Sequence, residues 1–242
     1  MDAHPMTPFG QALLAYQRGD TDAQFSIVRE DGFRATVPMS LFFRPEAEFS
    51  TVDRAGLAEC RGHVLDIGAG SGLHSLALQR RGLTVTAIDA TPEAVEVMRD
   101  RGVGDARCAD FFAFSDGRFD TFLMLGHGIG IVQTLERLGS FFRHAEGLLA
   151  PGGQVLVHSV DVRATTDPDH LAYHEANRER GRYVGTIRLQ FEYAGALGAP
   201  SEWLHVDPGT LREHAARAGW SFEMLLEEAE GEYLARLTPA PA

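Results

Sequence analysis

The sequence contains no lysine, because all 22 of its Lys and Arg residues are arginine. A Schiff-base enzyme and a Walker phosphate loop both require a lysine amine, so neither chemistry is available to this chain. The arginines are outnumbered by 34 acidic residues, which gives a formal net charge of −12. An extended nucleic-acid surface needs a clustered basic footprint. We therefore expect a small-molecule partner and no nucleic acid.

Cysteine is scarce, and long apolar runs are missing. The two cysteines, Cys60 and Cys108, have no ligand-like neighbours, which favours reduced structural thiols. No apolar run approaches the roughly 20 residues of a membrane helix. The first residues, MDAHPMTPFGQALL, show no basic segment followed by an apolar one, as a secretory signal would. We expect a cytoplasmic protein without a membrane partner, acting as a monomer or homodimer.

A glycine-rich stretch, VLDIGAGSG (64–72), is the most informative feature of the chain. The apolar residues at its start are typical of a buried strand. Its glycines, Gly68, Gly70 and Gly72, indicate a sharp turn or a close approach by another molecule. The stretch therefore predicts a strand that ends in a binding loop.

Strand and helix patterns alternate after this loop. An amphipathic helix pattern over 73–82 precedes a strand pattern over 83–89, and Thr91 and Pro92 open the next helix. Further strand patterns lie over 105–111, 119–125 and 154–160, with a helix pattern over about 133–149. This order predicts an α/β fold with a doubly wound, Rossmann-like and mostly parallel sheet.

The length suits one large domain, which we expect to span 1–242 in three parts. Residues 1–60 form an N-terminal cap segment with a helix over about 7–16 and a hairpin. Residues 61–161 form the cofactor-binding core. Residues 162–242 add extra strands after the fifth core strand, a helix over about 208–218 and an antiparallel hairpin over 221–238.

The glycine loop forms a cradle for a dinucleotide or another adenosine compound. Its spacing, G-x-G-x-G, differs from the dinucleotide pattern G-x-G-x-x-G. Asp66, just before the first glycine, would repel a pyrophosphate but can bind an ammonium group. Asp89 ends the next strand, where a carboxylate accepts hydrogen bonds from ribose hydroxyls. The pair favours an adenosine compound that carries an ammonium group.

Five stretches, VLDIGAGSG, TAIDATP, CADFF, FDTFLMLG and LLAPGGQVLV, resemble the ordered motifs of the class I S-adenosylmethionine-dependent methyltransferases over about 62–159. Several motifs in the right order are far more specific than any one of them. The resemblance implies S-adenosyl-L-methionine as cofactor and S-adenosyl-L-homocysteine as product. The stretch LMLGHGIGIVQTLERL is more loosely similar to small-molecule and glycine N-methyltransferases.

The resemblance also implies a set of cofactor-binding residues. Asp66, Gly68 and Gly70 would line the methionine moiety, Asp89 would hold the ribose, and Asp110 with Phe111 would frame the adenine. Arg44 is a candidate clamp for the methionine carboxylate, with a surface ion pair as its alternative role. The same site is expected to include Ala69, Ala90, Leu125 and Gly126.

Motifs of other methyltransferase classes are missing. Amino-methylating DNA enzymes carry Asn or Asp followed by Pro-Pro-aromatic after the fourth strand, and cytosine-C5 enzymes carry a cysteine nucleophile there. Catechol-type enzymes place metal-binding acids at this strand end, where Gly126 and His127 stand, so we expect no metal. His170 and His174 have the i,i+4 spacing of metal ligands, but a solvated helix face explains them better.

Several residues are candidates for catalysis and acceptor binding. His127 follows the fourth strand and is a candidate general base, with helix capping as its alternative role. His158 and Asp161 flank the end of the fifth strand and are candidates for orienting the acceptor. Aromatic residues after the core, Tyr183 and Trp203 among them, are candidates for its pocket.

We therefore expect an enzyme that moves a methyl group to an O, N or C nucleophile of a small molecule. Two alternatives remain open. The first is a non-catalytic regulator or partner subunit that binds S-adenosylmethionine. The second is a protein methyltransferase.

Overall fold

The structure is a computed structural model that describes residues 4–240. The chain forms two compact units. The first comprises the residues up to Phe49, Leu65–Phe114 and Arg188–Ser201, and the second comprises Ser50–Val64, Ser115–Ile187 and the residues from Glu202 onward. Each unit is described by itself. No helix within residues 4–240 is long and apolar enough to cross a membrane.

The larger of the two sheets has the strand order β11-β12-β7-β6-β3-β4-β5. Its strands β3 (His63–Ile67), β4 (Thr84–Asp89), β5 (Ala106–Cys108), β6 (Phe119–Met124) and β7 (Leu149–Val160) follow the predicted patterns. The last two strands, β11 (Trp220–Glu227) and β12 (Glu232–Pro239), pair antiparallel. The predicted α/β, Rossmann-like fold with a C-terminal antiparallel hairpin is confirmed.

In the first unit, two helices alternate with parallel strands. Helix α3 (Leu73–Arg80) follows the glycine loop, and α4 (Pro92–Asp100) follows β4, which pairs in parallel with β5. The apolar face of α4 packs on the sheet in a buried cluster with Ala87, Val103 and Ala106. The short helix η3 (Phe111–Ala113) ends this part. The alternation of strand and helix predicted from the sequence therefore holds here.

The N-terminal segment of the first unit contains α1 (Thr7–Gln17), β1 (Gln24–Arg29), β2 (Arg34–Pro38) and the short helices η1 (Met39–Phe42) and η2 (Glu46–Glu48). The predicted hairpin is confirmed, because β1 pairs antiparallel with β2. Strand β1 also pairs antiparallel with β8 (Thr186–Tyr193), and β9 (Ala196–Leu197) pairs with β8. Segments more than 150 residues apart along the chain thus share one sheet, which local patterns do not reveal.

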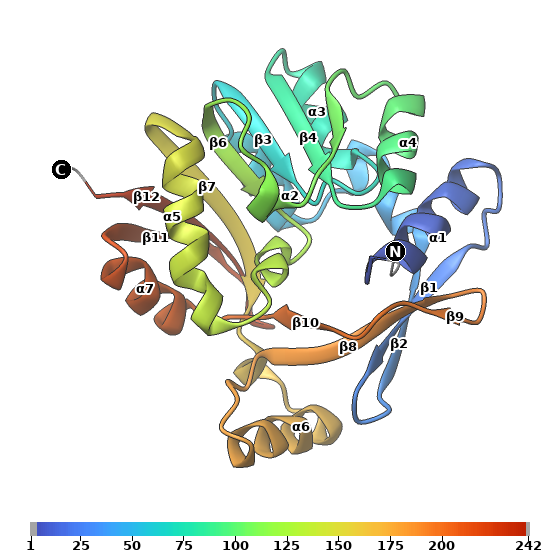
Figure 1. Cartoon of the computed structure of the whole chain (residues 1–242), viewed down its shortest axis with the longest axis vertical. Helices are drawn as coiled ribbons and strands as arrows, with labels where there is room; N and C mark the ends of the chain where they lie inside the picture. Colours follow the sequence, from blue (N-terminus) through green and yellow to red (C-terminus); the bar gives the residue numbers. More distant parts are fainter. Residues whose placement is uncertain (1–3, 241–242) are drawn as a thin grey trace. The chain divides into compact units, whose positions relative to one another are not determined.

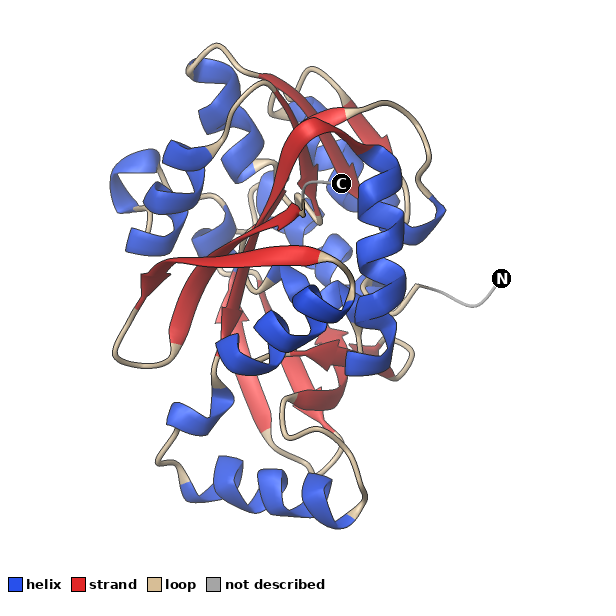
Figure 2. Cartoon of the chain, turned by 90° about the vertical axis from the view of Figure 1, so that its left-hand side faces the viewer, coloured by secondary structure: helices blue, strands red, loops and turns tan. Residues whose placement is uncertain are grey.

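The second unit contains the remaining helices and β10 (Ser201–Leu204). Its helices are α2 (Thr51–Glu59), η4 (Gly128–Val132), η5 (Leu135–Arg137), α5 (Leu138–Leu148), η6 (Val162–Ala164), α6 (Pro168–Glu179) and α7 (Pro208–Arg217). Strand β6 pairs in parallel with β7, and β7 pairs antiparallel with β12. Helix α2 contacts β12 and β7, while α7 packs along β11 and against α5 (Figure 1). In the turned view, helices flank these strands (Figure 2).

Two boundaries in the second unit differ from the sequence prediction. The helix expected over about 133–149 begins only at Leu138. The residues before it form two short 3-10 helices, η4 and η5, which are separated by Gln133 with its positive φ of 73°. Strand β7 begins at Leu149, ahead of the strand pattern expected over 154–160, and includes the APGG segment. Gly152, with a φ of 75°, bends the strand there without ending it.

We predict that Gly72→Ala lowers the free energy of unfolding by about 2 to 4 kcal/mol in urea denaturation. Gly72 has a φ of +74°, and a Cβ there would lie 2.6 Å from Val103 Cγ2 and 3.1 Å from Met98 Cγ. Gly82 is a matched control, since its φ is +82° but a Cβ would meet nothing within 4 Å. Gly82→Ala should lose only about 1 kcal/mol. Equal losses would show that the contact with Val103 is irrelevant.

Candidate active site

The glycine loop of the first unit has an open side. Gly68 and Gly70 have φ values of +69° and +56°, in the left-handed region that favours glycine. The N–H groups of Gly68 and Ala69 both donate to the carbonyl of Ile88, at 2.9 and 3.0 Å, and tie the loop to β4. A Cβ built at Gly68 would meet no atom within 4 Å. Another molecule can therefore approach the backbone closely at Gly68.

Asp89 joins this loop to the loop after β4. Its carboxylate accepts hydrogen bonds from the Gly70 N–H at 3.0 Å, the Thr91 N–H at 2.9 Å and the Thr91 hydroxyl at 2.8 Å. The residue is buried, and burial raises the pKa of Asp89 despite these hydrogen bonds. The carboxylate lies where the sequence predicts a ribose-binding group.

Asp66 lies in β3, directly before the glycine loop. It is only 2 % exposed, and its carboxylate accepts a hydrogen bond of 2.6 Å from the Ser75 hydroxyl on α3. Burial raises the pKa of Asp66 and outweighs the lowering effects of His74 and Ser75. Asp66 thus fixes the start of α3 beneath the loop, and its contact with a ligand stays a prediction.

The N-terminal segment covers the glycine loop from within the first unit. The Phe9 ring of α1 lies 3.7 Å from the position of a Cβ at Gly70 and packs edge-on against Phe25 and Phe42. The Ser71 hydroxyl donates to the carbonyl of Phe42. These contacts make the segment part of the loop's surroundings.

The other predicted cofactor residues occupy varied environments. Asp110 is exposed and accepts a hydrogen bond from the Phe112 N–H at 2.8 Å, which caps η3, while Phe111 is buried. The Arg44 guanidinium donates to the carbonyl of Leu41 and lies 5.6 Å from the Phe49 ring. Ala69 and Ala90 are half-buried; in the second unit, Leu125 is buried and Gly126 is exposed. The cofactor roles of all seven residues stay predictions.

In the second unit, His127 and His158 meet at Glu232. His127 has a φ of 59°, and its N–H donates to His158 Nδ1 at 3.2 Å. His127 Nε2 lies 2.9 Å from both carboxylate oxygens of Glu232, and His158 Nε2 is hydrogen-bonded to Glu232 Oε2. One ligand atom from each of the three residues lies within 4.8 Å of the others. The cluster can hold a proton or a divalent cation.

The charges of this cluster follow from burial and pairing. Burial alone would raise the pKa of Glu232, but hydrogen bonds with His127 and His158 outweigh it and hold that pKa well below its usual range. Burial lowers the pKa of His158 despite its hydrogen bond to Glu232. His205, whose ring centre lies 5.2 Å from that of His127, has its pKa lowered to about 3, chiefly by burial and further by the repulsion that a proton on His127 would exert. The cluster therefore contains an ionised carboxylate beside neutral His158 and His205.

Three further acceptor candidates lie in the second unit. The Trp203 indole packs against the turn after His127, since a Cβ at Gly130 would lie 1.9 Å from it. The Tyr183 hydroxyl donates to Asp207 at 2.7 Å. Asp161 is paired with Arg163. Trp203 therefore lies beside the segment of His127, whereas Tyr183 and Asp161 have partners of their own, and all three roles stay predictions.

Glu232 and His205 were not predicted from the sequence. Glu232 begins β12, in which Leu234 pairs with His158 of β7. Residues two apart on a strand share a face, so Glu232 lies on the same face of β12 as the residue opposite His158. Pairing the predicted hairpin with the strand over 154–160 would have found it.

The histidine pair of α6 differs from its predicted environment. The sequence favours a solvated helix face for His170 and His174, but His174 is only 3 % exposed. Three residues of α6 are buried, namely Tyr173, His174 and Asn177, and its other residues are polar or more exposed. The helix is therefore amphipathic despite its polar composition. Within residues 4–240, the side chains grouped closely enough to hold a metal ion are those of His127, His158 and Glu232. The histidine pair of α6 is not among them.

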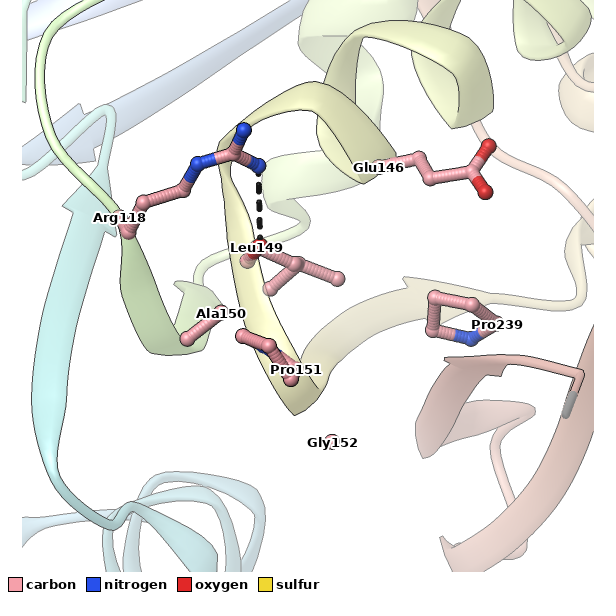
Figure 3. A pocket seen from close by; sticks show the side chains of 7 residues that line it. All are labelled: Arg118, Glu146, Leu149, Ala150, Pro151, Gly152 and Pro239. Atoms are coloured by element: carbon pink, nitrogen blue, oxygen red, sulfur yellow. Dashed lines mark hydrogen bonds between the residues drawn. The ribbon is translucent and has the colours of Figure 1, made fainter.

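A surface hollow of about 450 Å³ lies at the other end of β6 and β7 from His127. Arg118 donates to the Leu149 carbonyl at 3.2 Å, while Glu146 extends away on the other side (Figure 3). Its remaining lining, Ala150, Pro151, Gly152 and Pro239, is largely apolar. The hollow lacks convergent polar groups and does not qualify as the active site.

Comparisons with known proteins found similar methyltransferases. The profile of a family described as "Methyltransferase domain" matches residues 65–157. A SAM-dependent methyltransferase from Bacteroides fragilis, solved in complex with S-adenosyl-L-homocysteine, is 35% identical with a TM-score of 0.86. The alignment covers 99% of this chain and 97% of that one.

Curated relatives match a shorter part. A ubiquinone biosynthesis O-methyltransferase of Caulobacter sp. (strain K31) is 34% identical over 106 residues, which is 40% of each chain. A demethylmenaquinone methyltransferase of Tropheryma whipplei (strain Twist) is 30% identical over 105 residues, 39% of this chain and 40% of that protein. The matched part thus spans about 40% of the length of these relatives.

We predict that acid destabilises the protein partly through His205. Its pKa of about 3 lies below the ordinary 6.5, so the unfolded chain binds a proton that the folded state rejects. Stability should therefore fall as the pH drops below about 6.5, by about 1 to 2 kcal/mol between about pH 7 and pH 5. His205→Gln should lack this loss in urea titrations, whereas the exposed control His4→Gln should keep it. Parallel curves for wild type and His205→Gln would contradict the assignment.

Proposed function

The chain belongs to the class I S-adenosylmethionine-dependent methyltransferases, and we propose that it transfers a methyl group from S-adenosyl-L-methionine to an O, N or C nucleophile of a small molecule. The product of the donor is S-adenosyl-L-homocysteine. One observation carries the proposal: the first unit combines a glycine loop, open at Gly68, with the buried Asp89 carboxylate at the end of the adjacent strand. This is the arrangement that an adenosine cofactor requires.

The cradle fits the cofactor by its chemistry. The two carboxylate oxygens of Asp89 can accept hydrogen bonds from the ribose hydroxyls. In the structure they accept hydrogen bonds from the backbone N–H groups of Gly70 and Thr91 and from the Thr91 hydroxyl. In our proposal Asp66 lines the methionine moiety and binds its ammonium group. Asp110 and Phe111 frame the adenine. Arg44 takes the methionine carboxylate as a bidentate clamp.

The chain's own contribution to the reaction is alignment and proton removal. When bound, the donor supplies an already activated methyl group. Holding an acceptor in line with it contributes about 7 to 11 kcal/mol through proximity. His127, as general base, would add about 10²- to 10⁴-fold where the acceptor must lose a proton. His158 and Trp203, which lie beside it in the second unit, would orient the acceptor together with Asp161 and Tyr183.

The setting and the specificity of the enzyme are also proposals. We assign acceptor choice to the N-terminal segment up to about Arg44 and to the residues from about Val162 to Val206, because segments outside a repeating core carry specificity. We place the protein in the cytoplasm, as a monomer or homodimer. Within the described residues, neither Cys60 nor Cys108 forms a disulfide, which suits a reducing compartment.

The experiment that tests the proposal is incubation of the protein with methyl-labelled S-adenosylmethionine and a fractionated small-molecule extract. Mass spectrometry should find the label in a small molecule. Label confined to proteins would replace the proposal with a protein methyltransferase. Binding without any S-adenosylhomocysteine formed would replace it with a regulatory subunit.

We predict that Asp89→Ala weakens binding of S-adenosylmethionine at least tenfold in calorimetry, while NAD binds neither protein comparably. The variant loses charge-assisted hydrogen bonds to the ribose, each worth about 1.5 to 3 kcal/mol. Asp100→Ala, at an exposed acid of α4 with the same charge change, should bind as the wild type does. Circular dichroism must show that both variants fold. Unchanged affinity in a folded Asp89→Ala would remove Asp89 from the site.

We predict that His127→Asn lowers kcat by about 10²-fold or more with the identified acceptor, and leaves the Kd of S-adenosylmethionine within a few fold. Asparagine is chosen because it tolerates the left-handed φ of 59° at this position. A base acts on the transition state and only weakly on the bound donor. His170→Asn is the control on α6. A near-normal kcat would show that His127 is not the general base and has a structural role instead.

A further inference from the structure

The His127 and Glu232 pair decides which nitrogen of His127 is basic. An imidazole that is neutral carries one proton and offers one lone pair, so its tautomer determines where it accepts a proton. The second unit holds the groups that select this tautomer. The inference drawn from them rests on the proposed function and names a residue that acts through His127.

His158 provides the first constraint. The backbone N–H of His127 is an obligatory donor, and it points at His158 Nδ1 over 3.2 Å. His158 Nδ1 must therefore carry the lone pair, which leaves the proton on Nε2. That proton is donated to Glu232 Oε2. His158 thus presents a donor to the carboxylate and is itself fixed by the backbone of His127.

Glu232 provides the second constraint. An ionised carboxylate has acceptors only, and its oxygens lie 2.9 Å from His127 Nε2. His127 Nε2 must therefore carry a proton as well, and the lone pair of His127 resides on Nδ1. Within the described chain, the hydrogen bonds of the His127 ring all run through Nε2, which leaves Nδ1 available.

We infer that Glu232 is a positioning residue for methyl transfer: together with His158, it holds His127 in the tautomer whose Nδ1 takes the proton from the acceptor. As the acceptor's O or N attacks the methyl carbon, its proton moves to Nδ1. The carbon–sulfur bond breaks, and its electron pair stays on sulfur as the neutral thioether. His127 becomes an imidazolium beside the Glu232 carboxylate. The acceptor class is thus a hydroxyl or amine that carries a proton.

A metal site on the same three residues is less consistent with the hydrogen bonds. Coordination through both Nε2 atoms requires lone pairs there, and therefore a proton on Nδ1 of each imidazole. His158 Nδ1–H would then face the His127 N–H, so that two donors would oppose each other at 3.2 Å. The backbone of His127 favours the proton-transfer role over metal binding.

The Glu232→Gln variant separates positioning from a merely structural role. The amide has one acceptor and one donor end. His158 still requires an acceptor, so the amide oxygen should turn to it and the NH₂ group should face His127 Nε2. His127 should then change to the Nδ1–H tautomer and lose its basic nitrogen. We expect kcat to fall about 10²-fold or more, with the Kd of S-adenosylmethionine within a few fold.

The tautomers are read by long-range ¹H–¹⁵N spectra of histidine-labelled protein, with His127→Asn to assign the signals. Wild type should show Nε2–H on both His127 and His158, and Glu232→Gln should show Nδ1–H on His127. Glu230→Gln, at an exposed acid two residues away, should change neither the spectrum nor kcat. Zinc added to the wild type should leave the Nε2 protons in place.

Each outcome of these experiments supports or overturns the role of Glu232. Nδ1–H on either wild-type imidazole, zinc that removes the Nε2 protons, or an unchanged His127 tautomer in folded Glu232→Gln overturns the inference. If that variant does not fold, the wild-type tautomers and the zinc titration decide alone. The expected tautomers in a protein that methylates nothing would support the positioning by Glu232 and overturn the proposed function, so the two failures are distinguishable.

Discussion

The first unit depends on one buried carboxylate. Asp89 receives hydrogen bonds from both loops that follow β3 and β4, and so holds the left-handed turn at Gly70 in place. Thr91, which supplies two of these bonds, also limits how closely α1 can approach, because a Cβ at Gly10 would lie 3.0 Å from its hydroxyl. The position of the cap helix and the shape of the glycine loop thus follow from the same strand end.

The second unit depends on an equivalent constraint. Glu232 is shared by two imidazoles, and each of these is fixed in turn by the backbone or by a neighbouring ring. The backbone of His127 adopts a left-handed conformation between two glycines, Gly126 and Gly128, in order to direct its N–H at His158. A strained residue of this kind persists only where its surroundings over-determine it, which is common at functional sites.

Much of this architecture follows from local sequence patterns. The alternation of strands and helices, the strand-end position of Asp89 and the N-terminal hairpin were predicted, because each depends on neighbours within a few residues. Glu232 was not, since its partners lie 74 and 105 residues away and meet it only through the antiparallel pairing of β12 with β7. The pairing of β1 with β8 was missed for the same reason. Spacing predicts the elements, whereas strand pairing brings distant side chains together.

The two central carboxylates differ in the charge of their donors. Asp89 is buried and Glu232 is half-buried, and in both cases the loss of water contacts favours the protonated form. Asp89 is surrounded by neutral N–H and hydroxyl donors, which do not overcome burial, so its pKa stays raised. Glu232 faces imidazoles that can themselves become cations, and its pKa is lowered. A carboxylate of the first kind suits the recognition of neutral hydroxyl groups, as on a ribose. One of the second kind remains charged over the working pH range and stabilises a positive charge that appears beside it, as proton transfer to His127 requires.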